Sequence, residues 1–393
     1  MNRQSVLISG ASVAGPALAF WLSKYGFDVT VVEKAPSIRP GGYAVDFRGT
    51  AMRVLERMGL IEEIKKRETR AGSITMVDES GKVVAKLPDG FTSGELEVPR
   101  GDLAKVLYEA TRDNAEYVFA DSIESIAQMP DGVDVKFAIG KTRRFDLVVG
   151  ADGLHSNVRA LAFGEKSKFV RHMGYYIAIY SMPDFMNLKD AGKYYVQLGK
   201  RVGCFGSKNT GDAKAGFFFA SDVLDYDRRD VAAQKALLRQ TFADMKWETQ
   251  RMLEMMDAAP DFYFDSLSQV KMEYWSTGRV VLLGDAASCA SPMAGMGTSI
   301  AMVGAYVLAG ELEEANGNYA AAFARYESMM RKFVDEAQKM AEGVSWFIPA
   351  TRLKLWLSSR MWSLMPQSTM RKLMVEQPAK IANLVQIKDY SAV

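Results

Sequence analysis

The first 33 residues constrain the fold more than any other part of the chain. Residues 5–9 predict an apolar strand, residues 16–25 a helix, and residues 28–32 a second strand. Pro16 suits a first helical turn, because the amide hydrogen that proline lacks would have no partner there. A strand, a helix and a strand in this order predict a βαβ unit, and therefore an α/β fold with a parallel sheet.

The turn between the first strand and the helix reads GASVAG, residues 10–15. Gly10 permits the tight turn and Gly15 permits close packing of helix on strand, so a pyrophosphate can sit at the helix N-terminus. Glu33 ends the second strand, where an acid binds the hydroxyls of an adenosine ribose. Ser12 replaces the middle glycine of the usual fingerprint. Its Cβ narrows the space through which the pyrophosphate approaches the backbone, although its hydroxyl can donate to a phosphate oxygen. We favour a dinucleotide site over a turn that serves packing alone.

A second strand and acidic turn lie in residues 278–297, GRVVLLGDAASCASPMAGMG. Residues 280–283 predict a short buried strand, and Asp285 follows it, where a carboxylate can accept hydrogen bonds from sugar-like hydroxyls. Residues 295–297 are glycine-rich and lead to a helix predicted near residues 298–308. The free amide groups and the dipole of that helix favour a polar, partly anionic ligand.

Two further stretches carry candidate ligand contacts. The loop SIRPGGYAVDFRG, residues 37–49, contains a Gly41-Gly42 pair that permits a backbone path near a ligand. Arg39, Asp46 and Arg48 could face that ligand, and a solvated loop is an equally good interpretation for each of them. The stretch GADGLHSNVR, residues 150–159, places the acidic turn Asp152-Gly153 at the end of another predicted strand.

A second domain is predicted around aromatic strands between residues 174 and 275. Phe217 and Phe219 share one face of a strand by period two, with Phe218 on the other face. An aromatic face can wall a pocket for a flat substrate or can pack inside the sheet, and both interpretations stay open. We expect a discontinuous first domain of residues 1–72, 98–173 and 276–330, a substrate domain of residues 73–97 and 174–275, and C-terminal helices over residues 331–393.

Composition excludes several classes of function. The net charge of +2 provides no basic field for nucleic acid. The only cysteines are Cys204 and Cys289, which form no disulfide framework and suggest the reducing cytoplasm. Two histidines make a histidine base improbable, and no metal cluster or Ser-His-Asp pattern is present. We predict a cytoplasmic protein without a transmembrane segment. Residues 344–374 are amphipathic, and a docked terminal helix, a lid, a dimer face and a membrane-surface helix are the alternatives.

Three stretches together resemble the FAD-dependent aromatic-hydroxylase group, the para-hydroxybenzoate hydroxylase-like monooxygenases. They are GASVAG with Glu33, GADGLHSNVR, and GRVVLLGDAAS with SPMAGMG. Finer stretches, such as GGYAVDFRG and VPRGDL, resemble the tetracycline-inactivating branch, the tetracycline destructases. The resemblance implies a Rossmann-like FAD-binding domain, an inserted, mostly antiparallel substrate sheet and a helical C-terminus. Where that branch has Gly-Gln-Gly and asparagine, this chain has Gly295-Met296-Gly297-Thr298-Ser299.

The resemblance also implies a reaction. NADPH or NADH would reduce FAD, and O₂ would then give a flavin C4a-hydroperoxide that oxygenates a polycyclic phenol or enol, plausibly a tetracycline. The flavin carries this chemistry, so no catalytic side chain is predicted. Rival interpretations are a hydroxylase for another aromatic or polyketide compound, a non-oxygenating FAD oxidoreductase, and a non-catalytic flavin- or isoprenoid-binding module.

The resemblance places Asp285 at the ribityl chain, residues 295–299 at the pyrimidine edge of the flavin, Arg100 against FAD, and Asp152-Gly153 near both FAD and NAD(P)H. The complete predicted cofactor site comprises Gly10, Ser12, Ala14, Gly15, Glu33, Lys34, Gly42, Asp46, Arg100, Asp152, Gly284, Asp285, Pro292, Gly295, Gly297, Thr298 and Ser299. The predicted substrate contacts are Arg48, Phe217, Phe219 and Met293.

Overall fold

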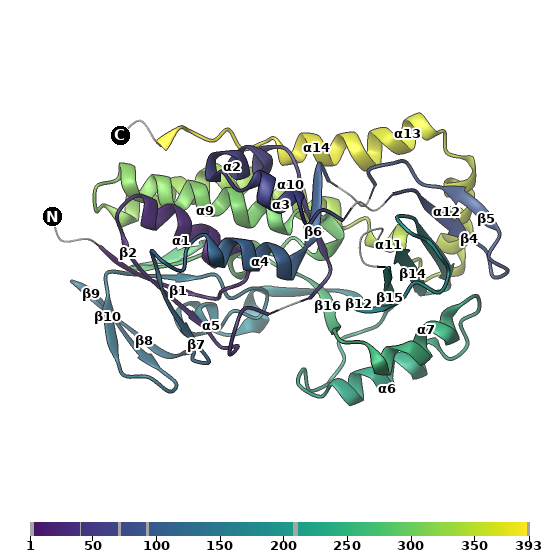
Figure 1. The fold of residues 1–393 in the computed structure, drawn as a ribbon, viewed down its shortest axis with the longest axis horizontal. Coiled ribbons are helices and arrows are strands. Elements are labelled where there is room, and N and C mark those ends of the chain that lie inside the picture. The colour runs from purple at the N-terminus through teal and green to yellow at the C-terminus, as the bar shows by residue number, and fades with distance from the viewer. Residues whose placement is uncertain (1–3, 40, 70–71, 92–93, 207–210, 391–393) are drawn as a thin grey trace.

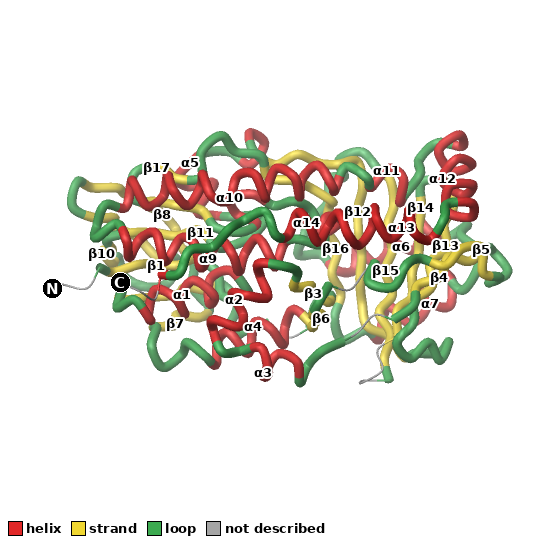
Figure 2. The backbone as a smooth tube through the Cα atoms, turned by 90° about the horizontal axis from the view of Figure 1, so that it is seen from above, coloured by secondary structure: helices red, strands yellow, loops and turns green. Residues whose placement is uncertain are grey.

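The structure is a computed structural model of the chain, and it describes residues 4–39, 41–69, 72–91, 94–206 and 211–390. Two large sheets lie toward opposite ends of a molecule that is longer than it is broad (Figure 1). The longest helices are α9 (Gly297–Glu314) and α10 (Tyr319–Ala341), and Figure 2 shows both over the half that contains β1 (Ser5–Ser9). Within the described residues, no helix has both the length and the apolar character needed to cross a bilayer.

The first sheet has six strands in the order β17-β18-β11-β1-β2-β7. Its other strands are β2 (Asp28–Glu33), β7 (Glu116–Phe119), β11 (Leu147–Gly150), β17 (Ser276–Thr277) and β18 (Val280–Leu282). Neighbouring strands are parallel except β17 and β18, which are antiparallel. The parallel α/β fold predicted from the first 33 residues is therefore confirmed.

The first sheet is covered on both faces. Figure 1 shows α1 (Ala14–Lys24), α4 (Arg100–Glu109) and α9 on one side, and a small sheet of β8 (Ile123–Met129), β9 (Gly132–Phe137) and β10 (Arg143–Phe145) on the other. Because both faces are covered, the central strand β1 carries a continuous apolar run, and its Val6, Leu7 and Ile8 are fully buried.

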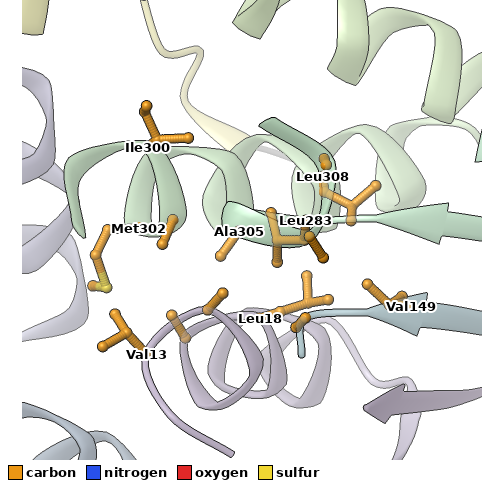
Figure 3. Close-up of a cluster of buried hydrophobic side chains, with 14 of the residues drawn as sticks. Val13, Leu18, Val149, Leu283, Ile300, Met302, Ala305 and Leu308 are labelled. Atoms are coloured by element: carbon orange, nitrogen blue, oxygen red, sulfur yellow. The ribbon is translucent and has the colours of Figure 1, made fainter. Parts of the chain in front are cut away.

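Helices α1 and α9 pack directly against each other over this sheet. Figure 3 shows Val13 and Leu18 from the first segment facing Met302 and Ala305 from the second. Small residues such as Ala305 allow this close approach. The contact is important for the site, because it brings the N-termini of both helices to the same end of the sheet.

The second sheet has seven strands in the order β16-β12-β15-β14-β13-β4-β5. They are β4 (Ile74–Val77), β5 (Val83–Lys86), β12 (Val170–Pro183), β13 (Gly192–Gln197), β14 (Lys200–Gly206), β15 (Asp212–Ala220) and β16 (Phe262–Val270). All neighbours are antiparallel except β4 and β13, which are parallel. The predicted, mostly antiparallel second sheet is confirmed.

The two faces of the second sheet have different partners. One face packs beneath α6 (Val231–Phe242) and α7 (Thr249–Met255). The opposite face packs against the C-terminal segment, which contains α11 (Val344–Phe347), α12 (Arg352–Leu364) and α13 (Gln367–Arg371). The helical C-terminus is therefore part of the core of this half.

The remaining elements connect these layers. They are β3 (Ala44–Phe47), β6 (Leu96–Pro99), which pairs with β3, α2 (Thr50–Met58), α3 (Ile61–Lys65), α5 (Asn157–Phe163), η1 (Lys166–Lys168), η2 (Met256–Ala258), α8 (Asp285–Ser288), η3 (Pro292–Ala294), η4 (Lys372–Glu376) and α14 (Gln377–Ala382).

Candidate functional site

The turn after β1 requires both of its outer glycines. Gly10 has a φ of 108°, and a Cβ there would lie 2.6 Å from the carbonyl oxygen of Ala151. A Cβ at Gly15 would collide with the carbonyl oxygen of Gly10. Helix α1 begins just beyond this turn, and its N-cap, Val13, offers no side-chain acceptor to the first amide groups. These N–H groups are therefore available to an anionic ligand. Ser12 is half-buried in the same turn, and Ala14 is the first residue of α1.

Glu33 lies beside this turn, as predicted. One carboxylate oxygen accepts a hydrogen bond from the backbone N–H of Ala11 at 2.9 Å, and the other accepts from Ala35 at 2.9 Å. Arg39 forms an ion pair with it at 3.4 Å, and Lys34 is exposed to solvent. A carboxylate has about four acceptor positions, so Glu33 can hold the turn and still accept hydrogen bonds from ribose hydroxyls.

Asp285 lies where the β18 turn meets the start of α9. A Cβ at Gly284 would lie 3.3 Å from the Ala14 Cβ, so this turn also approaches α1. A Cβ at Gly297 would lie 3.8 Å from a carboxylate oxygen of Asp285, which places that carboxyl group at the first turn of α9. Partial burial raises the pKa of Asp285 above its ordinary value, because desolvation disfavours the charged carboxylate.

The N-terminus of α9 has free hydrogen-bonding groups. Its N-cap, Met296, provides no side-chain acceptor for the first amides. Thr298 and Ser299 are buried, and the Ser299 hydroxyl has no hydrogen-bond partner among the described residues. Pro292 and Gly295 are exposed just before this helix, so a ligand can reach it.

Strand β3 and the residues on either side of it carry three predicted site residues, namely Gly42, Asp46 and Arg48. Asp46 and Arg48 form an ion pair at 2.8 Å, and their side chains are only 10% and 9% exposed. A Cβ at Gly295 would lie 3.8 Å from a carboxylate oxygen of Asp46, so this pair lies beside the turn before α9. Gly42 lies against Arg100, because a Cβ there would be 3.1 Å from the Arg100 Nε. The Nε atoms of Arg48 and Arg100 are buried and have no partner within the described chain.

Asp152 is placed differently. Its carboxylate accepts hydrogen bonds from the Ser156 hydroxyl and from the backbone N–H groups of Asn157 and Val158, the latter two at 2.8 and 3.1 Å. It therefore satisfies the start of α5, and its predicted contact with a cofactor stays a prediction. The Nε2 of the neighbouring His155 lies within hydrogen-bond distance of the Asp265 carboxylate, at 2.8 Å.

Phe217 and Phe219, the two phenylalanines predicted to wall the substrate pocket, are packed in the core of the second sheet. Phe217 and Phe219 lie in the cluster beneath α6 and α7, with ring centroids 5.0 and 6.0 Å from that of Phe242. Phe218 points to the other face and packs edge-on against Phe347 at 5.5 Å. Period two defined the two faces correctly, and the assignment failed because the location of the covering helices is not encoded in the strand itself.

Arg201 was not among the predicted residues, and it is the most unusual side chain on this second face. It is 1% exposed, and its Nε donates to the Phe347 carbonyl oxygen at 2.6 Å. Its guanidinium lies 3.9 Å from the ring centroid of Phe347 and 5.1 Å from that of Tyr194. Both terminal nitrogens are buried without a hydrogen-bond partner in the described part of the chain, and burial lowers the pKa of Arg201 to about 10.

The Arg201 face continues to the first site. Met293, beside α9, packs against the same apolar cluster as Phe218 and Phe347. Tyr263 also packs against it, and its ring lies 5.5 Å from that of Tyr43, near Arg100. Ser291, at a φ of 80°, has a buried hydroxyl without a partner among the described residues, and nothing in the sequence singled it out. An arginine within an otherwise apolar strand was the available signal for Arg201.

These residues fit an extended dinucleotide such as FAD. Two helix N-termini lack side-chain caps, an acid lies beside the first, and buried donors without partners lie around the second. A ligand with a pyrophosphate, two sugar-like chains and a polar ring system would provide hydrogen-bond partners for each of these groups.

Comparison with known proteins agrees with this fit. Residues 3–341 match the family model described as "FAD binding domain". A flavin-dependent monooxygenase from Legionella longbeachae is 42% identical over 344 residues, covering 86% of this chain and 88% of the relative. The crystal structure of the tetracycline destructase Tet(51) is 35% identical, with a TM-score of 0.83 and 99% of both chains covered. HpxO from Klebsiella pneumoniae, solved with FAD and uric acid, shares the fold at 21% identity and a TM-score of 0.77, with 98% of both chains covered.

Proposed function

The chain belongs to the FAD binding domain family and is a flavin-dependent monooxygenase, and from this premise we propose that it uses NAD(P)H and O₂ to oxygenate a tetracycline or a closely similar polycyclic enol. The similarity to Tet(51) over 99% of both chains supports the choice of branch. The observation that carries the substrate class is the buried, incompletely paired Arg201.

FAD supplies the electrons for O₂ and the oxygen transfer when it is bound. We assign its pyrophosphate to the start of α1 and its adenosine ribose to Glu33, which lies at that turn. Asp285 would accept hydrogen bonds from the ribityl chain, and the backbone N–H groups of Gly297 and Thr298 would donate to the pyrimidine edge of the flavin. The unpaired Nε of Arg100 would donate to FAD, and the unpaired Nε of Arg48 would donate to the substrate.

Arg201 defines what the substrate must offer. A guanidinium with two unpaired terminal nitrogens in an aromatic setting requires oxygen acceptors, preferably anionic ones, and leaving them unpaired is costly. Phe218, Phe347 and Met293 provide flat apolar contacts beside it. A tetracycline combines a flat ring system with ionisable enols and phenols, so it satisfies both requirements. The same apolar side chains exclude water during oxygen transfer.

Other parts of the assignment follow from the same premise. We propose that the half built on the first sheet binds FAD and that the half built on the second sheet binds the substrate, with the C-terminal helices closing the second. Cys204 and Cys289 are both free and buried, and we propose a reducing, cytoplasmic location.

The decisive experiment measures product mass. Purified protein with NADPH, O₂ and a panel of tetracyclines should yield a product heavier by one oxygen, with O₂ consumed in step with NADPH. NADH in place of NADPH determines the preferred donor. Oxygenation of another polyphenol, with every tetracycline unmodified, would disprove the substrate assignment. NADPH oxidation that never places oxygen in a product would instead favour an oxidoreductase of another type.

A further inference from the structure

Helix α12 has two different faces. Its inner face carries Ser358 and Trp362, both buried against the second sheet. Its outer stripe is apolar, with exposed fractions of 67%, 57%, 38% and 73% for Leu353, Trp356, Leu357 and Leu364. These positions follow the three- and four-residue spacing of one helix face. Arg360 lies on the same face between Leu357 and Leu364, and the rest of the stripe is exposed apolar surface without a partner in the described part of the chain.

The sequence that carries this stripe is basic. Residues 343–375 contain no aspartate or glutamate and five basic residues, namely Arg352, Lys354, Arg360, Arg371 and Lys372. The Arg360 guanidinium lies 5.5 Å from the Trp356 ring centroid, and the Lys354 ammonium lies 6.0 Å from that of Trp346. None of the five cations forms an ion pair with an acid of the described residues. Their charge is therefore available to an external anion.

The neighbouring strand extends the same surface. Strand β5 is the edge of the second sheet, and it exposes Val83 and Val84 at 53% and 48%. The Gln367 side chain donates to the Lys86 carbonyl oxygen at 2.9 Å, which ties the segment after α12 to this strand. Figures 1 and 2 both show α12 and β5 at the same end of the molecule. We call the outer stripe of α12, its five cations and the exposed β5 residues the α12 surface.

We propose that the α12 surface docks on an anionic phospholipid membrane, with α12 lying in the plane of the lipid headgroups. Tryptophan and leucine on one side of a helix with lysine and arginine around them are the chemistry that binds such an interface. A second copy of the chain is a poor occupant, because a two-fold interface would bring the cations of one copy against those of the other. No described helix can span the bilayer, so the attachment is peripheral.

Vesicle sedimentation tests this docking independently of turnover. The protein should sediment with vesicles of equal parts phosphatidylcholine and phosphatidylglycerol, remain in solution with phosphatidylcholine alone, and be released by high salt. Trp356→Glu and Leu353→Glu should each weaken vesicle binding by about tenfold or more, because a charge replaces apolar surface that the membrane would bury. Ile139→Glu is the matched control, because Ile139 is 80% exposed and lies far along the chain, between β9 and β10.

The triple change Arg352→Gln, Lys354→Gln, Arg360→Gln separates charge from apolar insertion. It should abolish the preference for the anionic lipid and the salt sensitivity while leaving the melting temperature unchanged. Equal binding to both vesicles, no binding to either, or equal loss in Ile139→Glu would overturn the proposal. A dimer in size-exclusion chromatography that Leu353→Glu dissociates would also overturn it, since a second copy would then cover the stripe.

Discussion

The Asp285 carboxyl group is half-buried beside the first turn of α9, and desolvation there disfavours its charged form. Ribityl hydroxyls would provide the hydrogen bonds that compensate for that burial. Asp285→Ala should therefore weaken FAD binding by about 1–3 kcal/mol, the usual cost of removing the acceptor of buried hydrogen bonds. Fluorescence titration of the apoprotein with FAD measures this change, with Lys141→Ala, an exposed position between β9 and β10, as the control. An unchanged dissociation constant for Asp285→Ala would place the ribityl chain elsewhere.

Arg201 can be tested by kinetics. Arg201→Met keeps the length and apolar contacts of the side chain and removes the donors, so KM for the substrate should rise about 10- to 100-fold, as expected for a lost charge-assisted hydrogen bond. FAD occupancy should not change, because Arg201 lies in the second sheet. A purely structural role would instead lower the melting temperature and leave KM near that of the parent.

At this scale the sequence indicated the surroundings of Gly10, Glu33 and Asp285 better than those of Arg201 and Phe219. Gly10, Glu33 and Asp285 lie in continuous motifs in which a strand end fixes the side chain locally. Arg201 depends on Phe347, which is distant in sequence, so no local pattern shows that its terminal nitrogens are unpaired. The placement of Phe219 depends in the same way on the helices that cover the sheet.

Strand β15 provides a matched pair of variants, because neighbouring residues face opposite sides. Phe219→Ala should destabilise the protein by about 3–5 kcal/mol, since it leaves a cavity beneath α6 and α7. Turnover per folded molecule should stay near that of the parent. Phe218→Ala, on the Arg201 face, should both destabilise the protein and reduce turnover per folded molecule. Urea unfolding and steady-state assays on both variants check this, and loss of turnover only in Phe219→Ala would restore the original pocket assignment.

The end of the chain is held by Glu311 in α9. Glu311 is fully buried, accepts a hydrogen bond from the Tyr390 hydroxyl at 2.8 Å, and forms ion pairs with Lys388, at 2.6 Å, and with Arg325. Burial by itself raises the pKa of Glu311, and the hydrogen bonds from Lys388, Arg325 and Tyr390 outweigh it and lower the pKa below the ordinary 4.5.

The sign of the resulting pH effect follows from linkage. A carboxylate whose folded pKa is lowered contributes stability that is present above its unfolded pKa and is lost as pH falls through the folded value. Glu311→Gln should lower stability at pH 7 by about 1.5–3 kcal/mol, the range for hydrogen bonds to a charged group. The difference between the variant and the parent should shrink as pH falls below 4.5. Urea unfolding at several pH values measures this, and a difference that is constant with pH would rule out the ion pairs as its source.

Across the whole molecule, the predicted FAD site joins segments that are far apart in sequence. The turn after β1 and Glu33 come from the first residues, β3 follows, and Asp285 and α9 come from the last third of the chain. The parallel sheet was predictable, because its βαβ pattern is local. The packing of α6, α7 and the C-terminal helices on the two faces of the second sheet was not predictable, because it depends on contacts between residues that are far apart in sequence.

FAD bound across these segments should therefore raise the free energy of unfolding of the whole molecule. A ligand at 100 times its dissociation constant adds about 2.7 kcal/mol to the free energy of unfolding. Denaturation should release FAD from the purified protein, and adding FAD to the apoprotein should raise its melting temperature. FMN at the same concentration should raise it less, because FMN lacks the adenosine half assigned to Gly10 and Glu33. In Glu33→Ala the advantage of FAD over FMN should shrink. Equal stabilisation by FMN and FAD would show that the first βαβ unit does not hold the adenosine, and the dinucleotide assignment would fail.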